Sequence, residues 1–244
     1  MIQIQYLHKS FGPNQVLQGI NLEVPRGSTT VIIGGSGSGK SVLMKHMLGL
    51  LQPDSGKVII DGEDVTGYSE REMVRVRGKF GMVFQQAALF DSMSVGENVA
   101  FPLREHRKEL SEAEIQKLVA EKLAIVDLKG IEHLFPAEVS GGMRKWVGLA
   151  RAVVLDPEIV LYDEPTTGLD PITTNSVDEM IMSARERLGI TSVVISHDIA
   201  SSFRIANHVA MLYEGVLVDQ GPPGQLRKSE HPHVKEFLST WFDR

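Results

Sequence analysis

The sequence predicts an α/β fold in which a mainly parallel core sheet is interrupted by an all-helical insert. Runs of β-forming residues occur towards both ends of the chain, and none occurs from residue 87 to about residue 157. Strands that alternate with helices favour a parallel sheet, because each parallel crossover needs a connecting segment. The 244 residues suffice for one domain with an inserted lobe. We expect a core at 1–86 and 158–228, a helical lobe at 87–157 and a tail helix at 229–244.

Each expected strand is a short apolar run, in most cases followed by a glycine, a proline or a charged residue. The runs, some with the turn that follows, lie at 2–7, 20–24, 30–33, 57–62, 79–84, 158–165, 191–198, 208–215 and 216–221. Apolar residues at helical spacing follow the run at 30–33. In the insert, Ser111 and Glu114 form a capping box ahead of an amphipathic helix, and a further helix is expected in the 140s.

Composition and charge exclude several classes of function. The net charge is 25 − 31 = −6, so no broad basic face is available for nucleic acid. The absence of cysteine excludes disulfides, thiolate metal sites and cysteine nucleophiles, and it fits a reducing cytosol. No apolar run approaches the ~20 residues of a membrane span, and the N-terminus lacks the apolar core of a signal peptide. We expect a soluble protein that can still dock on a membrane protein.

The segment "GGSGSGKS" fits the phosphate-binding pattern G-x-x-x-x-G-K-[ST] between an expected strand and an expected helix. Glycines let the loop curl so that its N–H groups face a phosphate, and the helix N-terminus adds positive potential. The lysine supplies a cation, and the last serine can hold Mg²⁺. The predicted nucleotide-binding residues of this loop are Gly34, Gly35, Ser36, Gly37, Ser38, Gly39, Lys40 and Ser41.

Two carboxylates end the apolar run "IVLYDEP". Asp163 would bind Mg²⁺ directly or through water, and Glu164 would be the general base that polarises the attacking water. Neighbouring side chains on a strand point to opposite faces, but a turn imposed by Pro165 can bring both into use. Beside a phosphate-binding loop, this pair predicts nucleotide hydrolysis.

Two further polar residues follow expected strands. Gln85 can ligate Mg²⁺ or position water, but Gln86 is adjacent, and the residues alone do not choose between them. His197 ends the run "VVIS" and can contact a γ-phosphate, although a lone histidine is more often structural. These residues alone do not decide which glutamine acts at the metal or whether the histidine is functional.

The phosphate-binding loop, Gln85, "SGG", "LYDEP", "TGLD" and "SHD" occur in this order within residues 2–228. The set resembles the ATP-binding-cassette (ABC) ATPase subunits of ABC transporters. The resemblance implies an ABC ATPase fold, in which a P-loop NTPase core with a mainly parallel sheet carries an antiparallel β subdomain and an inserted helical subdomain. It also implies ATP as substrate with Mg²⁺ held by Ser41, Gln85 and Asp163.

The resemblance also implies roles for other residues. Phe11 would stack on adenine with Val16 beside it, the alternative for Phe11 being a hairpin core residue. Gln85 and His197 would act with Glu164 and Lys40 in hydrolysis. The residues facing the ATP of the partner subunit would be the signature residues Ser140, Gly141, Gly142 and Met143, together with Asp170 of "GLD".

The partners implied are a second copy of the chain and integral-membrane permease subunits, with two ATP molecules held in an isologous dimer. The chain would then lie in the cytoplasm, peripheral on the cytoplasmic face of the inner membrane. Part of "AALFDSMSVGENVAFPL" would form a groove for a permease helix, and the alternative for each apolar residue is the core. The apolar residues concerned are Leu89, Phe90, Met93, Val95 and Val99.

Met143 stands where this family usually has glutamine, and "SGGM" is similar to the ATPases of Mla/MCE-type phospholipid transport systems. That subgroup implies MCE-type lipid-binding and accessory subunits as further partners. Trp146 departs even from the subgroup. The alternatives are the ATPase of an importer for amino acids or another small solute, and a non-transport ABC ATPase. The tail places Val234, Phe237, Leu238 and Trp241 on one helical face, which we expect to pack on its own subunit.

Overall fold

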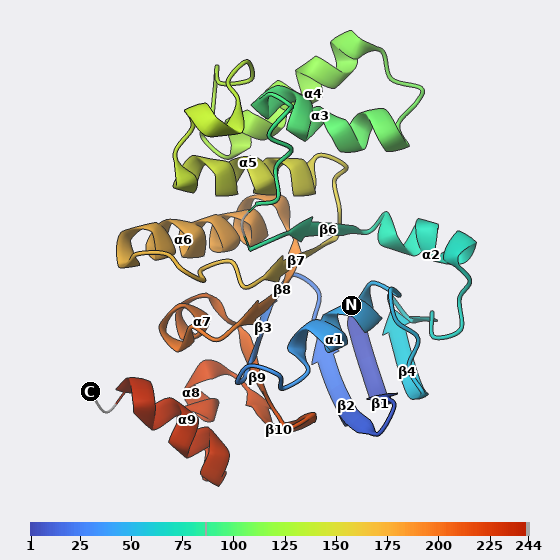
Figure 1. The fold of residues 1–244 in the computed structure, drawn as a ribbon, viewed down its shortest axis with the longest axis vertical. Helices are drawn as coiled ribbons and strands as arrows, with labels where there is room; N and C mark the ends of the chain where they lie inside the picture. The colour runs from blue at the N-terminus through green and yellow to red at the C-terminus, as the bar shows by residue number, and fades with distance from the viewer. Residues whose placement is uncertain (86, 243–244) are drawn as a thin grey trace.

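The computed structural model describes residues 1–85 and 87–242, with side chains up to Ser239, and its main element is a six-stranded sheet (Figure 1). The strand order is β10-β9-β3-β8-β7-β6. Five strands run parallel, and β10 pairs antiparallel with β9. The strands are β3 (Thr29–Ile33), β6 (Phe80–Val83), β7 (Ile159–Asp163), β8 (Thr191–Ser196), β9 (His208–Tyr213) and β10 (Val216–Gly221). The mainly parallel core sheet is confirmed.

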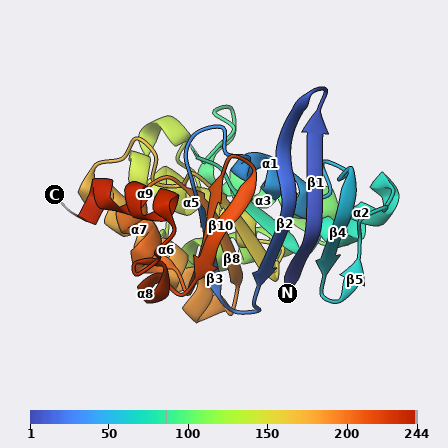
Figure 2. The ribbon, with the colours of Figure 1, turned by 90° about the horizontal axis from the view of Figure 1, so that it is seen from below.

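A second sheet of four antiparallel strands has the order β2-β1-β4-β5. Its strands are β1 (Ile2–Phe11), β2 (Asn14–Val24), β4 (Ser55–Ile60) and β5 (Glu63–Asp64), so the first two are longer than the sequence indicated. Helix α1 (Lys40–Met47) lies between the two sheets (Figures 1 and 2). Leu43 and Met47 are fully buried there, in one core that takes side chains from both sheets. Burial on two sides therefore fixes the helix that begins at the phosphate-binding loop.

The helical insert lies at one end of the molecule, between β6 and β7 (Figure 1). Its elements are α3 (Val95–His106), α4 (Glu112–Ile125), the short 3-10 helix η1 (Pro136–Glu138) and α5 (Gly141–Val153). The predicted capping box of Ser111 and Glu114 starts α4, and Ser94 with Glu97 starts α3 in the same way. Buried aliphatic side chains of these helices form one continuous core with the six-stranded sheet.

The remaining helices cover the sides of the sheets. They are α2 (Glu70–Arg77), α6 (Pro171–Leu188), α7 (Ile199–Ile205), α8 (Pro223–Leu226) and α9 (Pro232–Phe242). In Figures 1 and 2, α6, α7 and α9 lie on the side of the six-stranded sheet opposite the four-stranded sheet. Val234 and Leu238 of α9 are buried against this chain, as expected, whereas the side chain of Trp241 lies outside the described residues. None of the helices within the described ranges is long and apolar enough to cross a membrane.

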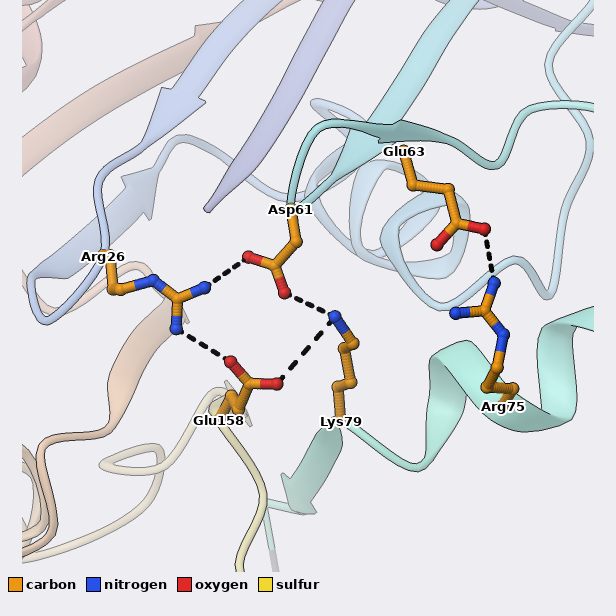
Figure 3. Close-up of polar contacts among 6 residues, drawn as sticks. All are labelled: Arg26, Asp61, Glu63, Arg75, Lys79 and Glu158. Carbon is orange, nitrogen blue, oxygen red and sulfur yellow. Dashed lines mark hydrogen bonds and ion pairs between the residues drawn. The ribbon is translucent and has the colours of Figure 1, made fainter.

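A ring of charges joins the two sheets at the N-terminal ends of β6 and β7 (Figure 3). Asp61, just after β4, accepts hydrogen bonds from Arg26 at 2.7 Å and from Lys79 at 2.5 Å. Glu158 accepts from Arg26 at 2.8 Å and lies 3.8 Å from Lys79. Arg26 follows β2 and Lys79 precedes β6, so the ring ties the four-stranded sheet to the edge of the six-stranded one.

Candidate active site

The predicted site residues leave the six-stranded sheet at one edge. In the parallel register Val83 pairs with Tyr162, Asp163 with Ile195, and Ile33 with Ser196. The segments that follow β3, β6, β7 and β8 therefore begin side by side at the carboxyl ends of these strands. Ligand sites of open α/β sheets lie at this edge.

The loop after β3 turns sharply because glycine occupies two crowded positions. At Gly34 (φ 153°), a Cβ atom would lie 2.1 Å from the carbonyl oxygen of Leu212. At Gly39 (φ 108°), it would lie 2.9 Å from the carbonyl oxygen of Val16. Only glycine fits such contacts at positive φ, so the loop packs directly on the backbone of β2 and β9.

Lys40, the first residue of α1, folds back over this loop. Its Nζ donates to the carbonyl oxygens of Gly34 and Gly35 at 2.9 Å each. Burial lowers the pKa of Lys40, whereas the charges of Glu164 and Asp163 act in the opposite direction. The side chain is 7% exposed, and no carboxylate within the described residues forms an ion pair with it. A buried ammonium group without an ion pair is well placed to neutralise an anion.

The two carboxylates after β7 have different environments. Burial raises the pKa of Asp163 at the end of β7, and the neighbouring charge of Glu164 raises it further. Glu164 has a left-handed backbone (φ 49°), and its N–H donates to the carbonyl of Ile195 at 2.9 Å. The turn that separates the carboxylates is therefore made at Glu164 itself, one residue before the expected position at Pro165.

Glu164 and His197 form a pair. The carboxylate Oε2 of Glu164 lies 2.7 Å from Nδ1 of His197 and accepts a hydrogen bond from the Thr167 hydroxyl at 3.0 Å. The His197 side chain is 54% exposed and that of Glu164 is 21% exposed, so the pair faces the open side of the site. A histidine held by a carboxylate beside a phosphate-binding loop is suited to proton transfer and to oriented hydrogen bonding.

The other predicted residues of the ATP site lie around this centre. Ser41 is exposed in the first turn of α1 and Gln85 is exposed after β6, whereas Gln86 lies outside the described residues. Serine and carboxylate oxygens of Ser41 and Asp163 are the hard donors that Mg²⁺ prefers, so the residues present fit that ion. Within the loop, Ser38 Oγ is buried and has no hydrogen-bond partner among the described residues.

The two predicted adenine contacts differ in position. Val16 lines a hollow of about 580 Å³ together with Gly37. Phe11 ends β1, is 46% exposed, and lies with its ring centroid 5.5 Å from the Lys9 ammonium group. Its exposure shows that it is not a hairpin core residue.

The signature residues begin α5, away from the loop of their own chain. Ser140 caps the helix by accepting from the N–H of Met143 at 3.2 Å. Asp170 caps α6 by accepting from the N–H groups of Ile172 at 2.9 Å and Thr173 at 3.1 Å. Both helix starts line a cleft of about 1180 Å³, which Gln85 also borders. Two helix N-termini at one open cleft can receive an anion.

A second, apolar groove of about 870 Å³ lies between α2, β6 and the helical insert. Its lining includes Phe84, Phe90 and Phe101, which are exposed by 42%, 43% and 36%. Of the apolar residues considered for such a groove, only Phe90 lines it. Val95 and Val99 belong to the core with 0% exposure, because they face inwards from the first two turns of α3. Leu89 and Met93 are half-buried, and Leu89 borders the cleft of the signature residues.

The sequence analysis gave no individual role to three residues at this site. Thr167 donates to Glu164, Lys145 of α5 donates to the carbonyl of Pro165, and Arg151 of α5 donates to the backbone after β6. Burial lowers the pKa of both Lys145 and Arg151. All three contacts join segments distant in sequence or depend on a turn, so no local pattern announces them.

Comparison with known proteins identifies the family. The ABC transporter family profile matches residues 17–167. The chain is 44% identical over 98% of its length to the "Probable ribonucleotide transport ATP-binding protein mkl" of Mycobacterium tuberculosis and spans 66% of that protein. It is 39% identical over 98% of its length to the "Intermembrane phospholipid transport system ATP-binding protein MlaF" of Haemophilus influenzae and spans 90% of it.

Solved structures agree with the sequence relatives. The dimeric ATP-binding cassette MJ0796, solved in a post-hydrolysis state with ADP and Pi, superposes with a TM-score of 0.80 and 30% identity. The match covers 91% of this chain and 99% of that one. A family profile over more than half of the chain, and a relative matched along nine tenths of its own length, lead to one conclusion: the chain belongs to the ABC transporter family.

Proposed function

We propose that this chain is the ATP-binding and ATP-hydrolysing subunit of an ABC transporter of phospholipids. The observation that carries the hydrolytic part is the Glu164–His197 pair at 2.7 Å, at the same sheet edge as the phosphate-binding loop. The relative named MlaF supports the phospholipid part, since it is matched over 90% of its length.

The chemistry is a single displacement at the γ-phosphorus. Loop N–H groups and the Lys40 ammonium hold the phosphates of ATP. Glu164 takes a proton from water as the water oxygen bonds to the γ-phosphorus, and the bond to the β,γ-bridging oxygen breaks to give ADP and phosphate. The hydrogen bonds from His197 and Thr167 orient the Glu164 carboxylate. His197 also has a second ring nitrogen with which to contact the γ-phosphate.

Mg²⁺ fits the oxygen donors at this edge, and Ser41, Asp163 and Gln85 would hold it. When bound, the ion neutralises charge that develops on the phosphate oxygens. Burial and the charge of Glu164 both disfavour the charged form of Asp163 and so raise its pKa. A bound cation would favour the charged form, as expected of a metal ligand.

Hydrolysis requires two copies of the chain in this proposal. The helix start at Ser140 lies on a separate cleft from the loop of its own chain, so it is available to a nucleotide bound by a partner. Two ATP molecules would then hold an isologous homodimer closed, and loss of the γ-phosphate would open it. In this motion the helical lobe at 87–157 would shift relative to the core at 1–86 and 158–228. The tail helix at 229–244 is the third part of the proposed division.

The apolar groove beside Phe90 and Phe101 would receive a cytoplasmic helix of a membrane-embedded permease. The chain would thereby be held on the cytoplasmic face of the inner membrane. Phe101→Ser should abolish co-purification with a co-expressed permease subunit, while Phe135→Ser should not. Phe135 is a matched control, because it is 44% exposed in the same lobe but lies outside the groove. Equal loss in both variants would contradict this use of the groove.

A second candidate is the ATPase of a small-solute importer, which the relative named for ribonucleotide transport favours. Gene neighbourhood separates the two. A permease gene beside an MCE-domain gene supports lipid, whereas a gene for a periplasmic solute-binding protein contradicts it. In proteoliposomes, the complex should move labelled phospholipid only with ATP, and ribonucleotide uptake instead would favour the second candidate.

The ATPase itself is tested with Lys40→Ala. Removing the charged donor should weaken ATP binding by about 10–100-fold and stop phosphate release. Lys57→Ala, which removes an exposed lysine of β4, should leave both unchanged. Unchanged nucleotide affinity in Lys40→Ala would reject the site.

A further inference from the structure

The segment that follows Gln85 by two residues has a strained backbone. Ala87 and Ala88 both have positive φ, at 61° and 46°, in the region that residues with a Cβ rarely adopt. Ala87 is also 1% exposed and packs against α5. A Cβ added at Gly148 of α5 would lie 3.1 Å from the Cβ of Ala87. Two consecutive residues in this conformation persist only where other contacts hold them.

The N–H of Ala87 donates to the carbonyl of Phe84 at 2.9 Å, and Arg151 of α5 supplies two further contacts. Its Nη2 donates to the carbonyl of Ala87 at 2.6 Å, and its Nη1 donates to the carbonyl of Ala88 at 2.8 Å. The fork of a guanidinium group suits two neighbouring acceptors, which a lysine ammonium group cannot match. Burial lowers the pKa of Arg151, and no carboxylate in the described part of the chain forms an ion pair with it. The guanidinium charge is therefore balanced mainly by hydrogen bonds to backbone carbonyls.

Arg151 also borders the apolar groove. Its guanidinium carbon lies 6.0 Å from the ring centroid of Phe90, whose ring is 5.1 Å from that of Phe101. Buried Asn98 fixes Phe90 from behind, accepting from its N–H at 2.8 Å and donating to its carbonyl at 3.1 Å. One side chain thus touches both the wall of the groove and the turn after Gln85.

We propose that Arg151 is a positioning residue for the nucleotide site: it holds the left-handed turn at Ala87 and Ala88 and so fixes Gln85 at the edge of the cleft. The proposal rests on the proposed function of Gln85 at the metal. The contact with Phe90 makes Arg151 the point at which a helix in the groove would act on that turn. Besides the two carbonyls, the half-buried guanidinium group has one further hydrogen-bond acceptor among the described residues, Asn98, whose Oδ1 lies 3.5 Å from Nη1.

The test measures ATP hydrolysis by the full chain against Mg²⁺ concentration. Arg151→Met should raise the half-saturating Mg²⁺ concentration by about 10–100-fold, the usual effect of losing a residue that orients a metal ligand. Affinity for a fluorescent ATP analogue without Mg²⁺ should change less than about two-fold, because the phosphate loop is untouched. Lys122→Met is the matched control, since Lys122 is a buried cation of the same lobe that pairs with Asp156 instead.

A double-mutant cycle separates positioning from general stability. If Arg151 acts through Gln85, then Gln85→Ala and Arg151→Met together should be no worse than the more severe single variant. Multiplied effects would overturn the proposal, as would an unchanged Mg²⁺ dependence in Arg151→Met. If Gln85→Ala alone has no effect on Mg²⁺ dependence, the proposal fails while the ATPase assignment still stands on Lys40.

A second pair of variants keeps the test decisive if Arg151→Met does not fold. Arg151→Lys keeps the positive charge but cannot donate to both carbonyls at once. It should therefore raise the half-saturating Mg²⁺ concentration, but less than Arg151→Met does. Adding Ala88→Gly should return the shift towards wild type, because glycine adopts positive φ without strain. A shift in Arg151→Lys that Ala88→Gly does not reduce would contradict the role of the turn.

Discussion

At the scale of single residues, the site depends on backbone conformations that only some side chains allow. Glu164 is held at φ 49° so that its carboxylate meets His197, and Gly34 lets the phosphate loop lie against the carbonyl of Leu212. The sequence indicated both residues. It did not indicate that the turn is made at Glu164, because left-handed glutamate is rare and is imposed by tertiary contacts such as its N–H to Ile195.

Gly34→Ala tests the tight contact. The added Cβ would lie 2.1 Å from a backbone oxygen that cannot move aside, so the free energy of unfolding should fall by at least about 1–3 kcal/mol. Gly35→Ala, with no atom within 4 Å of its added Cβ, should lose far less stability. Equal losses in urea unfolding would show that the contact between the loop and β9 is unimportant.

At the scale of elements, strands and capped helices follow from the sequence better than the joints between them. Ser111 and Glu114 predicted the start of α4, and the apolar runs predicted the strands of the parallel sheet. Helices α2 and α6 went unpredicted, although Ser69 with Glu72 and Asp170 with Pro171 are readable start signals. The contacts of Lys145 and Arg151 join α5 to loops 20 and 63–64 residues away, so no local pattern could reveal them.

The joint between α6 and α7 contains a buried titratable group. Asp178 is fully buried, accepts from Arg204 at 2.8 Å and is hydrogen-bonded by the Ser201 hydroxyl. Burial raises the pKa of Asp178, and it outweighs Ser201 and Arg204, which lower it. A carboxyl with a raised pKa contributes stability that is complete below its unfolded pKa of 3.8 and is lost as the pH rises through the folded pKa.

Asp178→Asn removes this titration and keeps an oxygen acceptor. The free energy of unfolding of wild type minus that of the variant should therefore decrease as the pH rises from about 4 to about 7. Urea unfolding at several pH values measures the difference. A difference that grows with pH would mean that the ion pair with Arg204 outweighs burial.

At the scale of the whole molecule, two sheets and an inserted lobe must keep fixed positions for the loops to meet. The charge ring of Figure 3 joins the sheets through Asp61, whose side chain is 17% exposed and which binds both Arg26 and Lys79. Asp61→Ala should lower the free energy of unfolding by about 1–2 kcal/mol, because two charged donors lose their shared acceptor. Glu63→Ala, which breaks the more exposed contact with Arg75, should cost less in the same urea titration.

The central proposal also concerns the whole molecule: two chains close around two ATP molecules. Glu164 is the general base for the hydrolysis that opens this dimer again. Glu164→Gln keeps the shape of the side chain but cannot take a proton from water. The most direct measurement is the mass of this variant in solution with and without ATP, together with its rate of phosphate release. We expect a dimer that appears only with ATP and no release of phosphate. A variant that stays monomeric with ATP, or that hydrolyses ATP at the wild-type rate, would contradict the account.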